Sequence, residues 1–247
     1  VILFPLLAHE GIGFWGAGTC HRITERTFTV DGRLMPLCAR CSGIYAAFLT
    51  TVGVSFLRGR RRPVEFPPPL ISILLLLFLG IVGIDGANSY LTLFPFLPHL
   101  YDPNILGPNT LRVITGSLEG VALAGLLLPA LHASFWLSPQ PVRTIPNLRE
   151  LGLILLAVAV SDLLLLWHPP FSFYPLSLLS LGGMVLLLTM TATPLVAVIT
   201  LRLGRVTDWS EAATLLCWGM VLALLLIAGL AWLRLALTGS FSFTLTP

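Results

Sequence analysis

Lysine is absent from this 247-residue chain, so its fourteen basic side chains other than histidine are all arginine. Acidic residues are also scarce, at eleven, and charged residues make up only 10% of the sequence. Hydrophobic residues make up 56%, and the mean hydropathy is +0.92. A water-soluble domain of this length carries far more charge, so the composition predicts a chain that is solvated by lipid.

Several kinds of chemistry are excluded by what is missing. The chain has no Walker phosphate-binding loop, no HExxH motif and no GxSxG motif, and its spans lack the paired histidines of di-haem membrane proteins. Four cysteines are too few for a disulfide scaffold. The formal net charge of +3 comes from arginines in short loops, which does not indicate nucleic-acid binding. We therefore expect a binding protein of the bilayer rather than an enzyme.

Long apolar runs separated by short polar loops predict the fold class, an all-α membrane protein. We expect one polytopic domain over residues 1–247, with six transmembrane helices, or seven if the polar-interrupted first run also spans. The predicted spans are residues 1–18, 42–57, 67–91, 111–137, 151–167, 176–201 and 210–237.

The polar segment over residues 19–41, called the head here, carries three of the four cysteines. Asp31-Gly32 is a strong two-residue turn signal between two strand-like segments, so it predicts a β-hairpin. Paired residues should have numbers that sum to about 63, which would bring Cys20 and His21 near Cys38 and Cys41.

Cys20, Cys38, Cys41 and His21 are the candidate metal ligands. The CxxC spacing lets two thiolates hold one ion, and a helix that begins near Cys41 would favour the thiolate form. Zinc is the expected metal, ahead of iron or an iron–sulfur cluster. A carboxylate or water is an alternative to His21, because adjacent residues do not easily bind one ion. Two further alternatives are a disulfide on an oxidising face and packed free thiols.

The head resembles the uncharacterised prokaryotic membrane-protein family called domain of unknown function 2085. The shared residues form two runs in the head. Further residues that resemble the family follow at Asp85-Gly86 and at Arg112, Thr115 and Gly116. The resemblance covers roughly residues 10–130 and implies a membrane protein, with no established activity to transfer. The matching residues of the two runs are Cys20, His21, Arg22, Glu25, Arg26, Phe28, Pro36, Cys38, Ala39, Arg40, Cys41, Gly43, Ile44 and Tyr45.

Three acids, Asp85, Glu119 and Asp162, lie inside apolar spans. Each costs about 2.5–3.5 kcal/mol at the bilayer centre, so it needs a partner, water or a proton. All three should lie in the half of the bundle near the head. We expect an intramembrane polar cluster that serves as a metal, proton or small-ligand site, or that simply fastens the head to the bundle. Its arginines would be Arg22, Arg26, Arg40 and Arg112.

Loop arginines predict the orientation through the positive-inside rule. Eight lie at the end that holds the Arg58–Arg62 cluster, against six at the head end. This places the head on the extracytoplasmic side of a prokaryotic inner membrane that the chain crosses several times.

Two functions are compatible with these features. The first is a metal-binding accessory or assembly subunit, in contact with the lipid bilayer and with other membrane subunits. The alternative is a transporter of a small ligand, ions or protons that uses the intramembrane acids. A membrane enzyme with an open metal position is a weaker third hypothesis.

Overall fold

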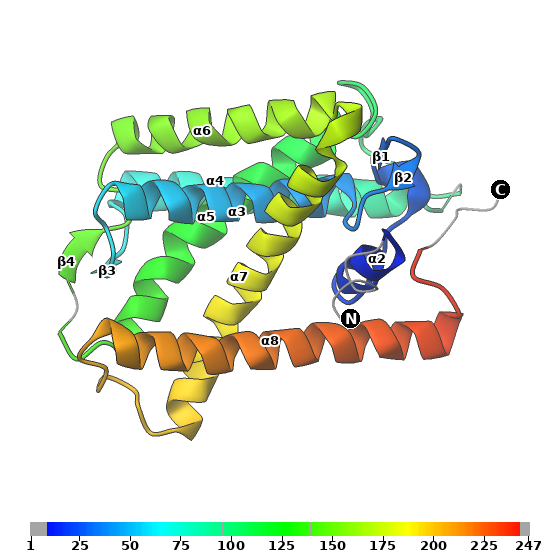
Figure 1. Ribbon diagram of the computed structural model, residues 1–247. Helices are drawn as coiled ribbons and strands as arrows, with labels where there is room; N and C mark the ends of the chain where they lie inside the picture. The colour runs from blue at the N-terminus through cyan, green and yellow to red at the C-terminus, as the bar shows by residue number, and fades with distance from the viewer. Residues whose placement is uncertain (1–8, 95, 139, 243–247) are drawn as a thin grey trace.

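The computed structural model describes residues 9–94, 96–138 and 140–242. Six helices in this part of the chain are long and apolar enough to cross a membrane, and they form one bundle (Figure 1). They confirm the predicted all-α membrane fold and agree with six of the predicted spans to within about three residues. The six helices are α3 (Ala39–Leu57), α4 (Pro69–Leu91), α5 (Thr110–Phe135), α6 (Leu148–Trp167), α7 (Phe173–Ile199) and α8 (Trp209–Thr238).

The first predicted span, residues 1–18, is only partly described. Its described part holds α2 (His9–Ala17), a helix of 9 residues. At 1.5 Å per residue α2 is about 14 Å long, roughly half the hydrocarbon thickness of a bilayer. Residues 1–8 of this prediction lie outside the described residues. Gly11, Gly13 and Gly16 have the spacing of a dinucleotide-binding G-x-G-x-x-G motif, but all three lie within α2 rather than between a strand and a helix, so they form no such loop.

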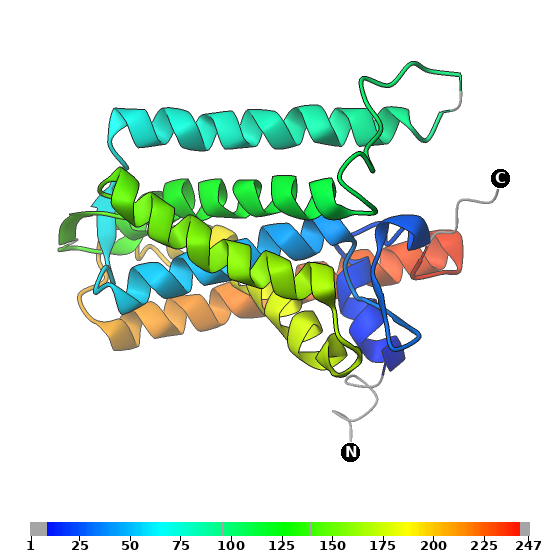
Figure 2. The same cartoon turned by 90° about the horizontal axis from the view of Figure 1, so that it is seen from above.

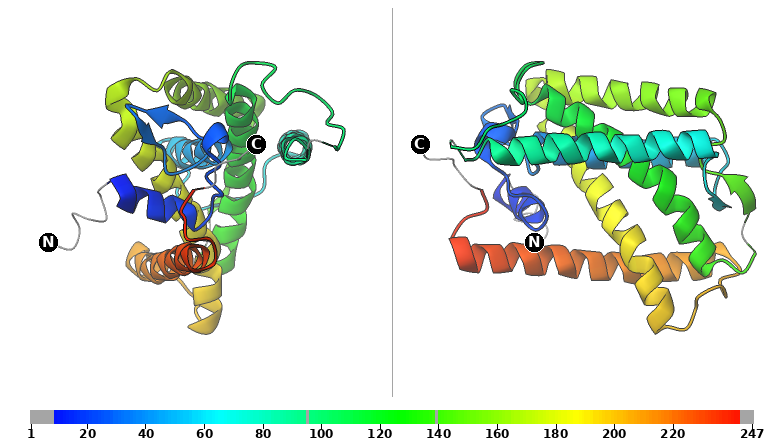
Figure 3. Two further views of the ribbon diagram at one scale, coloured as in Figure 1. Left: turned by 90° about the vertical axis from the view of Figure 1, so that its right-hand side faces the viewer. Right: turned by 180° about the vertical axis from the view of Figure 1, so that it is seen from behind.

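Helix α3 lies at the centre of the bundle, where it packs against α5, α6 and α7. Helix α4 lies on the outer side of α5, and α8 packs against α7 and α2 (Figures 2 and 3). Small residues allow the close crossing of α3 and α5, because a Cβ atom at Gly116 or Gly120 would overlap the backbone of α3. Large buried side chains such as Phe48 and Phe135 fill the remaining space.

The head caps one end of the bundle. Strands β1 (Thr29–Val30) and β2 (Arg33–Leu34) pair antiparallel, with Thr29 opposite Leu34 and Val30 opposite Arg33. These numbers sum to 63, and the positive φ angles of Asp31 and Gly32 suit a type I′ turn, so the predicted hairpin is confirmed. The ladder has only two residues per strand and does not reach Cys20.

The remaining short elements lie at both ends of the bundle. The 3₁₀ turns η1 (Thr24–Arg26) and η2 (Pro170–Ser172) belong to the head end. At the opposite end, β3 (Pro63–Glu65) and β4 (Gln140–Arg143) pair in parallel (Figure 1). The bundle therefore has two chemically different ends, with the cysteines of the head at one and the Arg58–Arg62 cluster at the other.

Candidate metal centre

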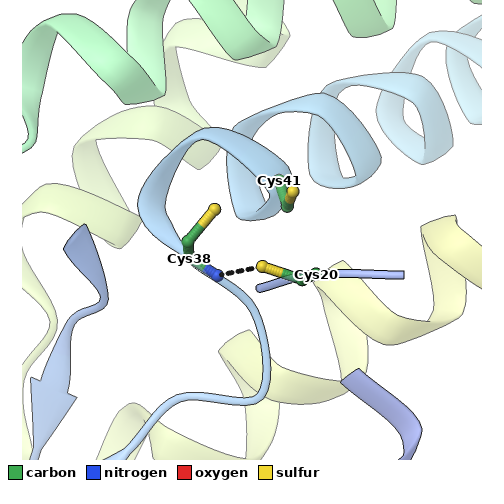
Figure 4. Close-up of side chains that lie close together, drawn as sticks. All are labelled: Cys20, Cys38 and Cys41. Atoms are coloured by element: carbon green, nitrogen blue, oxygen red, sulfur yellow. Dashed lines mark hydrogen bonds between the residues drawn. The ribbon is translucent and has the colours of Figure 1, made fainter. Parts of the chain in front are cut away.

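Three cysteines from two segments meet where α3 begins (Figure 4). Cys38 is the N-cap residue of α3, and Cys41 lies in its first turn. Cys20 follows α2, and its backbone N–H donates to the carbonyl oxygen of Gly16 at 3.0 Å. The three Sγ atoms lie within 4.8 Å of one another. We call these three residues the cysteine triad.

Backbone amides support the sulfur of Cys20. The N–H of Cys38 donates to Cys20 Sγ at 3.3 Å, and the N–H of Arg22 donates to it at 3.4 Å (Figure 4). The thiol groups of Cys20 and Cys41 hold the pKa of Cys38 well below its usual range by hydrogen bonding to its sulfur. The same contact with Cys38, together with burial, raises the pKa of Cys20 to about 12. Cys38 is therefore the cysteine outside the spans that most favours the thiolate, the form that binds metals.

The triad fits a metal better than a disulfide. All four cysteines are free thiols. Sulfurs bound to one tetrahedral zinc at about 2.3 Å lie about 3.8 Å apart. The triad needs a contraction of about 1 Å or less to reach that geometry, and its donors are the soft thiolates that zinc and iron–sulfur clusters prefer.

His21 is not part of this group. Its side chain is exposed, and the His, Cys, Asp and Glu side chains of the described residues form no metal-ligand group other than the triad. The two neighbouring side chains have different surroundings, because that of Cys20 is buried and that of His21 is exposed. The carbonyl oxygen of His21 instead accepts a hydrogen bond from Arg234 Nη2 at 2.6 Å. The described residues thus bring together three candidate ligand side chains, all of them cysteines.

The triad opens onto a cavity of about 260 Å³. The predicted arginines Arg22, Arg26, Arg40 and Arg112 all line it, together with the three cysteines. Apolar surface comes from Ile23 and Leu93, among others. The structure therefore brings together the two groups of residues that the sequence singled out separately, the cysteines and the arginines. We call this space the arginine cavity.

Asp85 forms the strongest polar junction beside this cavity. It is 1% exposed and pairs with Arg40 from α3. It also accepts hydrogen bonds from Tyr101 Oη and from Thr115 Oγ1 of α5, both at 2.9 Å. Asp85 therefore ties α3, α4, α5 and the loop after α4 together.

The other two intramembrane acids lie apart from Asp85. Asp162 accepts a hydrogen bond from Ser117 Oγ at 2.6 Å. Ser117 and Thr115 are two positions apart and thus about 200° apart around α5, so Asp162 and Asp85 lie on different sides of that helix. Glu119 is half-buried and takes part in no ion pair among the described residues. The predicted polar cluster is therefore divided between two faces of α5.

Three of the four predicted arginines bind neutral groups rather than acids. Arg22 donates to the carbonyl oxygens of Gly13 at 3.3 Å and Met35 at 3.4 Å. Arg26 Nη2 donates to Thr92 Oγ1 at 3.1 Å. Arg112 Nη1 donates to the side-chain oxygens of two asparagines, Asn104 at 3.1 Å and Asn109 at 3.2 Å.

Sequence reasoning missed three residues that hold the site together. Arg234, near the end of α8, donates to backbone oxygens of Cys20 and His21 and so fixes the triad segment against the bundle. Asn88 accepts a hydrogen bond from the backbone N–H of Leu100 at 2.6 Å, which positions Tyr101 for its bond to Asp85. A polar Asn at the end of an apolar span was the available signal for Asn88, whereas nothing local linked Arg234 to a segment more than 200 residues away.

Comparisons with known proteins agree with this description. The family described as "predicted membrane protein (DUF2085)" matches residues 20–126, which include the triad and the four arginines. An uncharacterized protein of Methanothermobacter thermautotrophicus is 36% identical over 107 residues, which cover 43% of this chain and 82% of the relative.

A second uncharacterized relative comes from Methanocaldococcus jannaschii. It is 28% identical over 110 residues, which cover 44% of this chain and 62% of the relative. No solved structure matches the chain. The family match, the identity to the first relative and the six apolar helices lead to one conclusion: the chain belongs to the predicted membrane protein family DUF2085.

Proposed function

We propose that this integral membrane protein binds one metal ion through Cys20, Cys38 and Cys41, with zinc as the expected ion. The observation that carries the proposal is the convergence of three sulfurs within 4.8 Å at the N-terminus of α3. The helix N-terminus favours negative charge, which supports the thiolate form of Cys38 at the N-cap. An iron–sulfur cluster is less suited, because it is usually held by four cysteines.

All three cysteines line the arginine cavity, so a metal ion held by them would have this cavity beside it. Structural zinc sites are closed by four protein ligands, whereas zinc sites that act on ligands keep one position for water or substrate. Three ligands beside a cavity therefore favour a metal that meets a ligand over a purely structural one.

The wider biological role rests on the sequence. The role of the protein as an accessory or assembly subunit of a larger membrane complex stays a prediction. Its location in a prokaryotic cell membrane, with the head outside, also stays a prediction. Transport is less favoured, because Asp85 is committed to Arg40, Tyr101 and Thr115.

Elemental analysis of the detergent-purified protein tests the metal directly. We expect about one metal ion per chain in the wild type and its loss in Cys38→Ser. Cys217→Ser is the matched control, since Cys217 is an exposed free thiol of α8 outside the triad and should leave the metal content unchanged. Absence of metal from a folded wild-type protein reconstituted with zinc would contradict the proposal.

A further inference from the structure

The arginine cavity has an unbalanced positive charge. Arg22 comes from the segment after α2, Arg26 from η1, and Arg40 and Arg112 from the first turns of α3 and α5. No Asp or Glu lines the cavity. Asp85 neutralises Arg40, and the other three arginines form no ion pair with an acid among the described residues. Cys38, which also lines the cavity and favours the thiolate, offsets part of this charge, and positive charge stays in excess around one small space.

These arginines are also incompletely hydrogen-bonded. Arg22 is 6% exposed and Arg112 is 5% exposed. The buried Nε atoms of Arg22, Arg40 and Arg112 have no hydrogen-bond partner in the part of the chain that the structure describes. Buried charges and unpaired donors are costly unless an opposite charge meets them. Three of the arginines that border the cavity therefore each carry an unpaired donor, which adds to the cost of their buried charge.

Electrostatics around the cavity favour an anion for two further reasons. Helices α3 and α5 both begin here, and helix N-termini attract negative charge. Burial together with the neighbouring charge of Arg40 lowers the pKa of Arg26. Arg26 is therefore a cation in poor solvation beside like charge, which a bound anion would relieve.

We propose that Arg22, Arg26, Arg40 and Arg112 form a binding site for a phosphate group. Guanidinium groups match the oxygens of phosphate through paired, charge-assisted hydrogen bonds. A divalent tetrahedral anion uses donors from several directions, whereas a carboxylate offers one plane and one charge. The volume of about 260 Å³ is below the roughly 300–1,000 Å³ of drug-sized ligand sites, so the occupant is small or enters only with its phosphate end.

The phosphate could belong to a free ion or to the headgroup of a lipid, because the cavity lies at the head end of the bundle. Both sources share the chemistry that the four arginines recognise. The site does not require the metal, since its donors are arginines. Its failure and the failure of the metal proposal can therefore be told apart with the metal-free Cys38→Ser protein, which should still bind phosphate.

Calorimetric titration of the detergent-purified protein with inorganic phosphate tests the site. We expect saturable binding that weakens about tenfold or more in Arg26→Gln, because each charged hydrogen bond contributes at least about one factor of ten. Arg33→Gln is the matched control: Arg33 is also in the head, but it donates to Tyr174 Oη and does not line the cavity. Arg26 has a single described side-chain hydrogen bond, so its replacement should spare the fold.

A measurement on the wild type avoids any effect of substitution on folding. Phosphate should protect Arg26 and Arg112 from phenylglyoxal, with Arg33 unprotected, as mapped by mass spectrometry. Repeating the mapping in nanodiscs of phosphatidylcholine, with and without phosphatidic acid, shows whether the bound phosphate group is a free ion or belongs to a lipid headgroup. Protection by either phosphate source supports the site and names its occupant. Absence of protection by both, or equal weakening by Arg26→Gln and Arg33→Gln, would overturn it.

Discussion

At the scale of single residues, the buried carboxylate of Asp85 is the clearest structural feature of the head end. Asp85 is almost fully buried, yet it meets a guanidinium and two hydroxyl groups, so each of its oxygens has a partner. Helix α4 packs mainly against α5 rather than α3. The pair between Arg40 and Asp85 therefore links two helices that otherwise make little direct contact. Removing one partner of such a pair leaves an uncompensated charge, which costs far more than losing a surface pair.

We expect Asp85→Asn to lower the free energy of unfolding by about 3 kcal/mol, because Arg40 would then be left without its counter-charge. Denaturant titration in detergent micelles measures this change. Glu65→Gln is the control, since the pair between Glu65 and Arg143 is half-exposed and should contribute at most about 1 kcal/mol. Equal losses in the two variants would contradict the structural role of Asp85.

At the scale of elements, the crossing of α3 and α5 organises both the bundle and the site. Gly116 and Gly120 form a small-residue packing face, since a Cβ atom at either position would overlap the backbone of α3. The same crossing places the first turns of the two helices side by side, which brings Arg40 and Arg112 to one cavity. Close helix packing is therefore a condition for the arginine cavity.

Gly120→Ala should destabilise the protein by about 1–3 kcal/mol, because the new methyl group would overlap the carbonyl oxygen of Ile44 and force the helices apart. The same denaturant titration measures the change. Gly53→Ala in α3 is the matched control, since a Cβ there has no neighbour within 4 Å. The packing argument fails if Gly120→Ala is as stable as Gly53→Ala.

The whole molecule is polarised along the direction of its spans. At the head end Arg22 and Arg112 are buried and Arg40 is paired with Asp85. The orientation in the membrane stays a prediction from the number of loop arginines at each end. At the opposite end most arginines are exposed. The exposed arginines there are Arg58, Arg61, Arg143, Arg149, Arg202 and Arg205.

This orientation predicts the access of a membrane-impermeant maleimide. A cysteine at the exposed position Thr29 should react in right-side-out vesicles, and one at the exposed Arg205 should react only in inside-out vesicles. Mass spectrometry identifies the labelled site, and Cys217 within α8 is the internal control that should stay unlabelled in both. The opposite pattern would place the head in the cytoplasm.

The amino-acid sequence by itself determined the features that depend on local patterns. Apolar runs of sufficient length specify six spans, since backbone polar groups in lipid are satisfied within each helix. Asp31-Gly32 specified the hairpin and its register, because a two-residue turn of this type sets the strand pairing. The cysteine triad could also be predicted from the sequence, since Cys38 and Cys41 lie close together where one helix begins.

Only the tertiary structure decided how distant segments share one site. It buried the side chain of Cys20 in the triad and left that of His21 exposed outside it. It separated Asp162 from Asp85 by placing them against different faces of α5. It also joined the four arginines and the triad around one cavity. These outcomes depend on the relative rotation of packed helices and on contacts between segments far apart in the chain, which no local pattern encodes.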